Sequence, residues 1–450
     1  MKRILVLGAK LQGTEIIYLA KEAGYYVTVI DRNPLAPGAD LADEYICEDI
    51  LNEEAVKAYF RTADAVIPAI EDLEVLERAV QYGSLTGTKV LFDLEAYRIS
   101  SSKNRSNQLF SELRIPMPRY YPDCAYPVIV KPDGLSGSAG VVRFNKKEQL
   151  QAYLREKGSE NAVIQEYLQG PSYSLEVIGD GERFYFPQIT EVVVDDNYDC
   201  KRIIAPARIS GDIRRQMLDI GQTLANRLKI KGIFDIEVIE DKGVLKILEI
   251  DARFPSQTPI SVYRSTGLNM VKIMVELLLD GRFPEQVVRS GEKACIYQQI
   301  QVSGADIEVL GEHIISGCSH LKRVRGFLGA DEVLTDYFGG SGGFPGADGT
   351  ATDYCGCKAG LSGADEVLTN YFGGSGGFPG AVLGLTDYPG SKGRRPGEWR
   401  AIVIITRDSE EQAFQAFEAF LTNIRRNYLK VEKTGRRQRK GVLYHDKASA

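Results

Sequence analysis

The stretch FDIEVIEDKGVLKILEIDARFPSQTP, residues 234–259, decides the fold of this chain. Two strand patterns rich in apolar residues, 232–239 and 244–250, flank the sequence EDKG, whose Asp and Gly suit a tight turn. This arrangement predicts an antiparallel β-hairpin. In such a hairpin Glu237 and Glu249 lie close together.

Charged residues alternate with apolar ones along the second strand of this hairpin. Glu249, Asp251 and Arg253 occupy every second position, so all three side chains point to one face. The two carboxylates, together with that of Glu237, repel one another unless cations neutralise them, and such a set of oxygen ligands suits Mg²⁺. A hairpin with a solvated acidic face is the alternative that the spacing leaves open.

Length and composition set the broad class of the protein. The chain has 450 residues, of which 44% are apolar, and this predicts two or three domains with sizeable cores. No run of 18 apolar residues occurs, and the N-terminus enters a strand pattern without a cleavage site. We therefore expect neither a membrane span nor a signal peptide, and a cytoplasmic location.

Cysteine, histidine and charge argue against several other classes of protein. The seven cysteines form no CxxC pair and the three histidines lie far from any ligand spacing, which disfavours a zinc site. A net charge of −6 disfavours binding of nucleic acid over the whole surface. The basic cluster KTGRRQRK at 433–440 is typical of a solvated tail, with a nucleic-acid arm as the alternative.

The N-terminal residues form a βαβ pattern. A buried-strand run at 3–7 leads through GAKLQG into a helical pattern, and a second strand, YVTVID, ends at Asp31. The spacing between Gly8 and Gly13 departs from GxGxxG. The motif alone therefore gives little support for dinucleotide binding.

A polar crevice is predicted at the carboxyl ends of these parallel strands. Lys10 and Gln12 protrude from the turn, Asp31 ends the second strand, and Glu71 follows the strand AVIPAI. Open α/β sheets bind ligands at this edge. We expect an amino-acid or nucleotide pocket there, and ordinary surface polar residues are the alternative.

The hairpin residues resemble the metal-binding signature of ATP-grasp ligases. Glu237 and Glu249 are followed by Asp251 and Arg253 at alternate positions, although the third ligand of the family is more often Asn. The string EIDARFPSQTP is similar, more narrowly, to the ATP-grasp ligases of pyrrolysine biosynthesis, the 3-methylornithine–L-lysine ligases. This resemblance extends from residue 1 to about residue 300.

The resemblance implies an α/β (α+β) fold in three parts. A Rossmann-like domain is expected at 1–96. An ATP-grasp domain is expected at 97–305, with a lid at about 115–175. A C-terminal segment at 306–450, which carries a Gly-rich repeat insertion, completes the chain.

A nucleotide site is also implied by the resemblance. ATP-grasp chains carry one Lys in a helix and a second at the end of a strand, which points to Lys103 and Lys131. The following loop, DGLSGSAG, lacks GK[ST] and is interpreted as a hairpin lid over the triphosphate, although linkers have the same composition. The residues implied for the nucleotide are Lys10, Asp31, Asp49, Ile50, Lys103, Lys131, Ser136, Ser138, Gln165, Glu166, Tyr167 and Leu168.

Substrate contacts follow from the same resemblance. The Ser-Leu-Glu sequence after residue 173 corresponds to a contact with an ornithine-type substrate, whose amino groups require an acid. The residues implied for the two amino-acid substrates are Leu11, Gln12, Glu71, Ser174, Leu175, Glu176, Asp235, Arg253, Ser256 and Thr258.

The implied reaction joins (3R)-3-methyl-D-ornithine to the ε-amine of L-lysine through an acyl phosphate, with ATP and two Mg²⁺ ions. Glu237, Glu249 and Asp251 hold the metal in this scheme, while Lys131 and Arg253 neutralise the charge that develops during phosphoryl transfer. Neither a nucleic acid nor a membrane is expected as a partner. Another ATP-grasp ligase or carboxylase, or a catalytically silent nucleotide-binding protein, are the alternatives.

Four units of 17 residues tile positions 329–396. Each begins with GA, and the first, GADEVLTDYFGGSGGFP, differs from the third at one position. The units are rich in glycine and poor in apolar residues, which disfavours a packed solenoid. We interpret them as a low-complexity insertion that arose by duplication, after which the strand pattern EWRAIVIIT rejoins the body.

Deletion of residues 346–396, three complete units, is expected to leave turnover within a few-fold of wild type and to raise thermal stability slightly if it changes it. The reason is that each doubling of the length of a surface loop costs only about 0.6 kcal/mol. Turnover and melting temperature of the deletion variant check this, and loss of folding contradicts it. Limited proteolysis of the full chain should cut first within 339–397.

Overall fold

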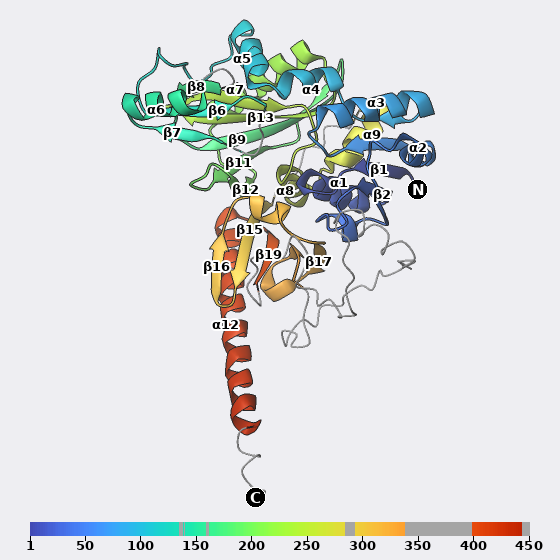
Figure 1. Ribbon diagram of the computed structural model, residues 1–450, viewed down its shortest axis with the longest axis vertical. Coiled ribbons are helices and arrows are strands. Elements are labelled where there is room, and N and C mark those ends of the chain that lie inside the picture. Colours follow the sequence, from blue (N-terminus) through green and yellow to red (C-terminus); the bar gives the residue numbers. More distant parts are fainter. Residues whose placement is uncertain (135–137, 139, 159–161, 284–292, 338–397, 443–450) are drawn as a thin grey trace, which may run out of the picture.

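The computed structural model describes residues 1–134, 138, 140–158, 162–283, 293–337 and 398–442, with side chains in the last segment as far as residue 428. The predicted α/β class is confirmed, because helices pack on sheets of five, eleven and three strands. In Figure 1 the long helix α12 (Glu410–Val442) extends away from the body of the molecule. None of the described helices is long and apolar enough to cross a membrane.

A parallel sheet of five strands begins the chain, in the order β3-β2-β1-β4-β5. Its central strands are buried apolar runs, and the βαβ pattern predicted from the sequence is confirmed by the parallel pairing of β1 with β2. The elements are β1 (Arg3–Leu7), α1 (Leu11–Glu22), β2 (Tyr26–Asp31), η1 (Ala39–Leu41), β3 (Glu44–Cys47), α2 (Glu53–Thr62), β4 (Ala65–Pro68), α3 (Leu73–Thr86) and β5 (Lys89–Val90).

The turn between β1 and α1 requires both of its glycines. Gly8 has a φ of 96°, and a Cβ there would lie 2.7 Å from the carbonyl oxygen of Ala69. A Cβ on Gly13 would lie 2.2 Å from the carbonyl oxygen of Gly8. This close packing brings the first turn of α1, with Leu11 and Gln12, against the ends of the strands.

The large sheet has the strand order β14-β13-β9-β11-β12-β15-β19-β18-β17, with β10 beside β9 and β16 beside β15. Its strands are β9 (Ser172–Asp180), β10 (Phe184–Tyr185), β11 (Ile189–Val194), β12 (Cys200–Ala205), β13 (Lys231–Asp241), β14 (Val244–Asp251), β15 (Ala294–Ser303), β16 (Asp306–Val309), β17 (Lys322–Arg325), β18 (Glu332–Thr335) and β19 (Glu398–Arg407).

The small sheet, β7-β6-β8, lies over one end of the large sheet in Figure 1. It consists of β6 (Val128–Pro132), β7 (Val142–Phe144) and β8 (Ala162–Glu166). The remaining helices are α4 (Leu94–Ser100), α5 (Lys103–Glu112), α6 (Lys147–Lys157), α7 (Gly211–Leu228), α8 (Thr258–Thr266), α9 (Met270–Asp280), α10 (His313–Ser316) and η2 (Phe327–Gly329).

The predicted hairpin is confirmed as β13 and β14, at one edge of the large sheet. Glu237 lies directly opposite Glu249, and Asp235 lies opposite Asp251. The opposite side of β13 pairs with β9, so the acidic residues of the hairpin continue onto a third strand.

The first repeat unit does not behave as expected. Residues 329–337 are part of the body, and β18 fills the position between β17 and β19. Val333, Leu334 and the carboxylate of Glu332 are all fully buried, and Glu332 is paired with Arg323. The prediction of a low-complexity segment is therefore wrong for 329–337, because sheet neighbours outside the repeat supply the packing that a single unit lacks. The rest of the repeat, 338–396, lies outside the described residues.

A buried carboxylate joins the N-terminal domain to the helix that follows the hairpin. Glu15 of α1 is 1% exposed, and its Oε2 accepts a hydrogen bond of 2.8 Å from the backbone N–H of Ile260. The residue at the N-cap of α8, Gln257, supplies no side-chain cap, so Glu15 caps this helix from a distant part of the chain. Burial raises the pKa of Glu15 to about 8, against the lowering effect of the Ile260 amide.

Substitution Glu15→Gln is expected to remove part of the pH dependence of stability. Because the pKa of Glu15 is raised from 4.5 to about 8 on folding, the wild-type protein loses stability as pH rises through this interval, and Gln keeps an acceptor for Ile260 without a charge. Between pH 6 and pH 9 the wild type should lose about 2 kcal/mol more than the variant. Urea unfolding at the two pH values measures this difference, and equal losses would refute the assignment.

Candidate active site

Two rows of polar side chains cross β9, β13 and β14 on one face of the large sheet. The rows are Glu176–Asp235–Asp251 and Ser174–Glu237–Glu249. The rows share a face because their members lie two residues apart along each strand. Five carboxylates are thereby gathered on neighbouring strands, four of them from the hairpin of β13 and β14 and the fifth, that of Glu176, from β9.

Burial raises the pKa values of Glu176, Asp235, Glu237 and Asp251, and neighbouring carboxylates add to the effect at the last three. Burial, followed by the charge of Glu249, raises the pKa of Glu237 to about 8. Burial raises the pKa of Asp251 to about 6 and, against the lowering effect of nearby hydroxyls, that of Glu176 to about 7. The pKa of Asp235 is raised well above its ordinary value by burial and then by Asp251. A cation is the partner that this cluster needs.

The donor set fits Mg²⁺. Among the described residues, Oδ1 of Asp251 is buried without a hydrogen-bond partner, and the carboxylates of Glu237 and Glu249 lie in the adjacent row. These are hard oxygen donors, which Mg²⁺ prefers. Lys131 lies close to the same cluster. Burial lowers the pKa of Lys131, and the negative charges of Glu249 and Glu237 partly oppose this effect.

Arg253 connects this cluster to the N-terminal domain. Its guanidinium Nη2 lies 2.8 Å from Oδ2 of Asp251 and 2.9 Å from Oε1 of Glu71, and its side chain is only 13% exposed. The same oxygen of Glu71 accepts a hydrogen bond of 2.8 Å from Nε2 of Gln12. A chain of contacts thus runs from the large sheet to the first turn of α1.

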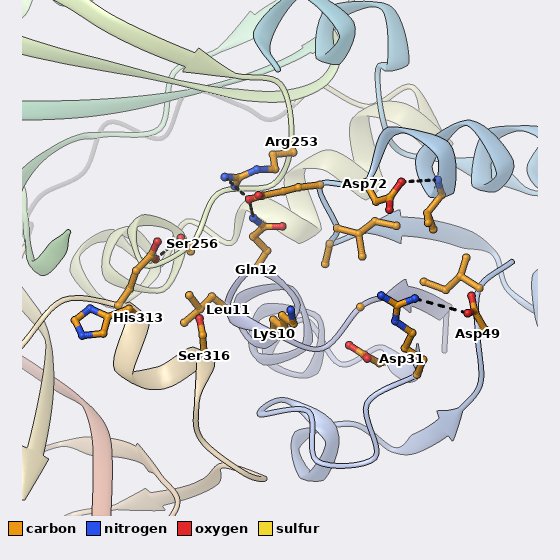
Figure 2. Close-up of a pocket in the computed structure, with 18 of the residues that line it drawn as sticks. Lys10, Leu11, Gln12, Asp31, Asp49, Asp72, Arg253, Ser256, His313 and Ser316 are labelled. Atoms are coloured by element: carbon orange, nitrogen blue, oxygen red, sulfur yellow. Dashed lines mark hydrogen bonds and ion pairs between the residues drawn. The ribbon is translucent and has the colours of Figure 1, made fainter. Parts of the chain in front are cut away.

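A cavity of about 490 Å³ lies where these parts meet, shown in Figure 2. Nine of the residues implied for substrate or nucleotide line it: Lys10, Leu11, Gln12, Asp31, Asp49, Ile50, Glu71, Arg253 and Ser256. The structure therefore brings the polar strand ends of the N-terminal sheet together with the segment after β14. The predicted crevice exists, and it is closed on its far side by residues of the C-terminal segment.

Asp31 shapes the wall of this cavity. Its two carboxylate oxygens accept hydrogen bonds of 2.8 Å from the backbone N–H groups of Ala9 and Asn33. It is 8% exposed, whereas the neighbouring Lys10 is exposed. Asp31 holds two backbone turns in place, and Lys10 offers its charge to the cavity.

The residues implied for the triphosphate lie near the acidic rows. Lys131 is the last residue but one of strand β6, and Lys103 is the first residue of α5. Ser138 donates a hydrogen bond of 2.7 Å to the carbonyl oxygen of Tyr198, which ties the loop after β6 to the segment before β12. Ser136 lies outside the described residues.

The segment implied for adenine has partners of its own. The side chain of Gln165 is 2% exposed and donates to the carbonyl oxygen of Pro118 at 3.4 Å. Glu166 forms ion pairs of 2.8 Å with Arg119 and with Lys246. These side chains are held inside the protein.

Other predicted residues differ in what they can offer a ligand. The backbone N–H of Tyr167 donates to the carbonyl oxygen of Pro127, so within 166–168 the backbone of Leu168 remains the candidate for adenine. Leu175 is 1% exposed in the apolar core, on the face opposite its neighbours, so its side chain cannot reach a ligand. Thr258 begins α8 and its buried hydroxyl has no hydrogen-bond partner among the described residues.

The cavity wall also includes Asp199, Glu312 and His313, to which the sequence assigned no role. Glu312 accepts a hydrogen bond of 3.0 Å from Oγ of Ser256, and burial raises its pKa. The spacing of the histidines in the sequence indicated no partner for His313, yet His313 and Asp199, 114 residues apart, are in contact. No motif marks either segment, so only the fold reveals this contact.

Comparison with known families and proteins identifies several similar sequences. Residues 100–257 match the ATP-grasp domain family, and residues 4–91 match the family described as PylC-like, N-terminal domain. The 3-methyl-D-ornithine–L-lysine ligase of Methanosarcina mazei is 37% identical over 318 residues, which cover 70% of this chain and 82% of that enzyme. The enzyme of the same name from Methanosarcina barkeri is 35% identical, with coverage of 70% and 84%.

Among solved structures, an L-amino acid ligase from Bacillus licheniformis superimposes with a TM-score of 0.61. The two chains are 16% identical, and the match covers 94% of this chain and 97% of the other. At this identity the likeness shows the fold alone.

Substitution Glu249→Gln is expected to lower turnover at least about 100-fold, because Glu249 is one of the three carboxylates predicted to hold the Mg²⁺ ions that neutralise phosphate oxygens. Folding should survive, since the substitution relieves repulsion with Glu237, which lies directly opposite. Steady-state turnover at saturating Mg²⁺ and a thermal melt are the two measurements. Turnover near that of the wild type would show that Glu249 is not a metal ligand.

Proposed function

The chain belongs to the 3-methyl-D-ornithine–L-lysine ligase family of ATP-grasp enzymes, and on that premise we propose how its residues join the two amino acids. It is an ATP-dependent ligase that forms a C–N bond. The carboxylate of 3-methyl-D-ornithine is activated as an acyl phosphate, and the ε-amine of L-lysine then displaces the phosphate. The contact chain from Asp251 through Arg253 to Glu71 carries the proposal, since it joins a phosphoryl-transfer site to an amine site.

The acid substrate binds against β9 and β13 in this proposal. Glu176 and Asp235 are adjacent on paired strands and keep buried oxygens without partners, which suits two ammonium groups. The pKa of each carboxyl group is raised in the free protein. Binding of the ammonium groups lowers these pKa values again, because a nearby positive charge stabilises the ionised carboxylate. The hydroxyls of Ser256 and Thr258 border the same segment and contribute polar contacts.

Phosphoryl transfer takes place over Glu237, Glu249 and Asp251. Two Mg²⁺ ions held by these carboxylates would neutralise the phosphate oxygens and align the transferring group. Lys131 and Arg253 add fixed positive charge on either side of the cluster. ATP is the phosphoryl donor, and the backbone at Leu168 receives its adenine.

The amine substrate binds in the cavity of the N-terminal domain. Glu71 and Gln12 are positioned by each other and by Arg253, and Leu11 lines the adjacent wall. A carboxylate beside an amide suits the α-amino and α-carboxylate groups of an amino acid. The side chain of L-lysine can then extend toward the acyl phosphate with its ε-amine.

ADP release is expected only when both 3-methyl-D-ornithine and L-lysine are present with ATP and Mg²⁺. The reason is that the acyl phosphate and the ADP formed with it remain in the site until an amine attacks the acyl carbon, so turnover requires both the acid and a nucleophile. A coupled ADP assay with the two amino acids added singly and together measures this. ADP release with D-alanine or bicarbonate, but not with ornithine analogues, would assign the chain a different acid, and no release with any acid would make it a silent nucleotide-binding protein.

A further inference from the structure

Asp199 and His313 form a hydrogen-bonded pair at the wall of the cavity. Oδ2 of Asp199 accepts a hydrogen bond of 3.0 Å from the backbone N–H of His313 and is also in contact with its ring Nδ1. Asp199 is 7% exposed, whereas the side chain of His313 is 59% exposed and lines the cavity. Among the described residues Nε2 of the ring has no hydrogen-bond partner, so it is available to a ligand.

Backbone hydrogen bonds and a closely packed glycine hold the Asp199–His313 pair in position. Asp195 holds the loop that carries Asp199, since its Oδ1 accepts the N–H groups of Asn197 at 2.8 Å and Asp199 at 3.1 Å. Gly311 leaves room for the carboxylate, because a Cβ there would lie 2.2 Å from Oδ2 of Asp199. Both sides of the contact are therefore shaped to bring the carboxylate to the ring.

The reaction requires a base that the residues discussed so far do not supply. A free ε-ammonium group has a pKa of about 10.4, so near neutral pH it must lose a proton before it can attack. Glu71 is occupied by Arg253 and Gln12, and Asp31 is occupied by backbone amides. Glu312 is occupied by hydrogen bonds that its Oε2 accepts from Ser256 and Gln257.

We propose that His313, oriented by Asp199, is the general base that accepts a proton from the attacking ε-ammonium group. This inference rests on the proposed function. A carboxylate at Nδ1 holds the ring in the tautomer that keeps the lone pair on Nε2, and it stabilises the imidazolium that forms. Figure 2 shows His313 at the end of the cavity that also holds Ser256, whereas Gln12 lies further in, close to Arg253.

The protons and bonds of the step balance. Nε2 takes one proton from the ammonium group, and the free amine pair forms the C–N bond to the acyl carbon. The bond from that carbon to the phosphate oxygen breaks, and the phosphate leaves with the electron pair. The second proton of the nitrogen departs with the phosphate as hydrogen phosphate, and the imidazolium returns the first to solvent.

Several charged groups lie around the ring of His313. Asp195 and Asp199 face it from the loop before β12, and Glu312 precedes it in the chain. Arg253 lies across the cavity, and Arg400 of β19 donates to the carbonyl oxygen of Gly317 at the end of α10.

A metal-binding site is the alternative interpretation of the group around His313. Asp195, Asp199 and His313 offer ligand-type atoms within 4.8 Å of one another. The hydrogen bonds favour the dyad, because one oxygen of Asp199 already receives two contacts from His313 and Oδ1 of Asp195 receives two amides. Binding of a cation is therefore an outcome of the test.

Two assays separate activation of the acid from attack by the amine. In the first, hydroxylamine replaces L-lysine and traps the acyl phosphate as a hydroxamate, and this nucleophile is largely unprotonated at neutral pH and needs no base. In the second, formation of the isopeptide with L-lysine is followed. If the wild-type protein yields no hydroxamate from 3-methyl-D-ornithine, the proposed function fails, whatever the role of His313.

His313→Gln is expected to lower isopeptide formation about 100-fold and to leave hydroxamate formation near the wild-type rate. The lost activity should return as pH approaches about 10, where free L-lysine is deprotonated. Asp199→Asn should act in the same direction, because the ring loses its orientation. His320→Gln is the matched control, since this histidine pairs with Asp40 outside the cavity lining, and both assays should be unchanged.

Three results would overturn the proposal. In the first, His313→Gln forms isopeptide at the wild-type rate. In the second, the variant loses hydroxamate and isopeptide formation equally, which indicates a structural role. In the third, Zn²⁺ or Mn²⁺ binds the wild-type protein stoichiometrically in calorimetry and fails to bind His313→Gln, which makes the group a metal site.

Discussion

Repulsion among buried carboxylates is the interaction on which the rest of this structure depends. Strands β9, β13 and β14 place Glu176, Asp235, Glu237, Glu249 and Asp251 on one face, and the pKa values of Glu176, Asp235, Glu237 and Asp251 are raised there. Such a face lowers the stability of an empty protein at neutral pH, and cations and phosphates relieve it. Ligand binding and folding stability are therefore linked through the same side chains.

The hairpin and its charges could be predicted from sequence because they depend on local rules. Alternation along a strand places Glu249 and Asp251 on one face, and a two-strand register places Glu237 opposite Glu249. The resemblance of EIDARFPSQTP to a known family added the substrate side of the site. These inferences need only neighbours within one supersecondary unit.

The contacts that could not be predicted join segments far apart in the chain. Asp199 meets His313, Glu15 caps a helix beginning at Thr258, and Glu332 accepts contacts from Arg323 and from Tyr18 of the N-terminal domain. Each depends on how separate sheets are placed against one another, and neither periodicity nor spacing carries that information. The same limit explains the error at β18, whose packing partners lie outside its repeat unit.

The strand β18 also has a genetic consequence, because it is encoded inside a tandem repeat. Replication slippage that removed the first two units would bring GADEVLTN of the third unit to the position now held by GADEVLTD. The strand sequence EVLT would be restored unchanged, and Asn370 would replace Asp336, whose Oδ1 accepts a hydrogen bond of 2.7 Å from the backbone of Arg400. An amide oxygen can accept the same bond. A gene with this arrangement can shorten by two units and still encode every strand of the described sheet.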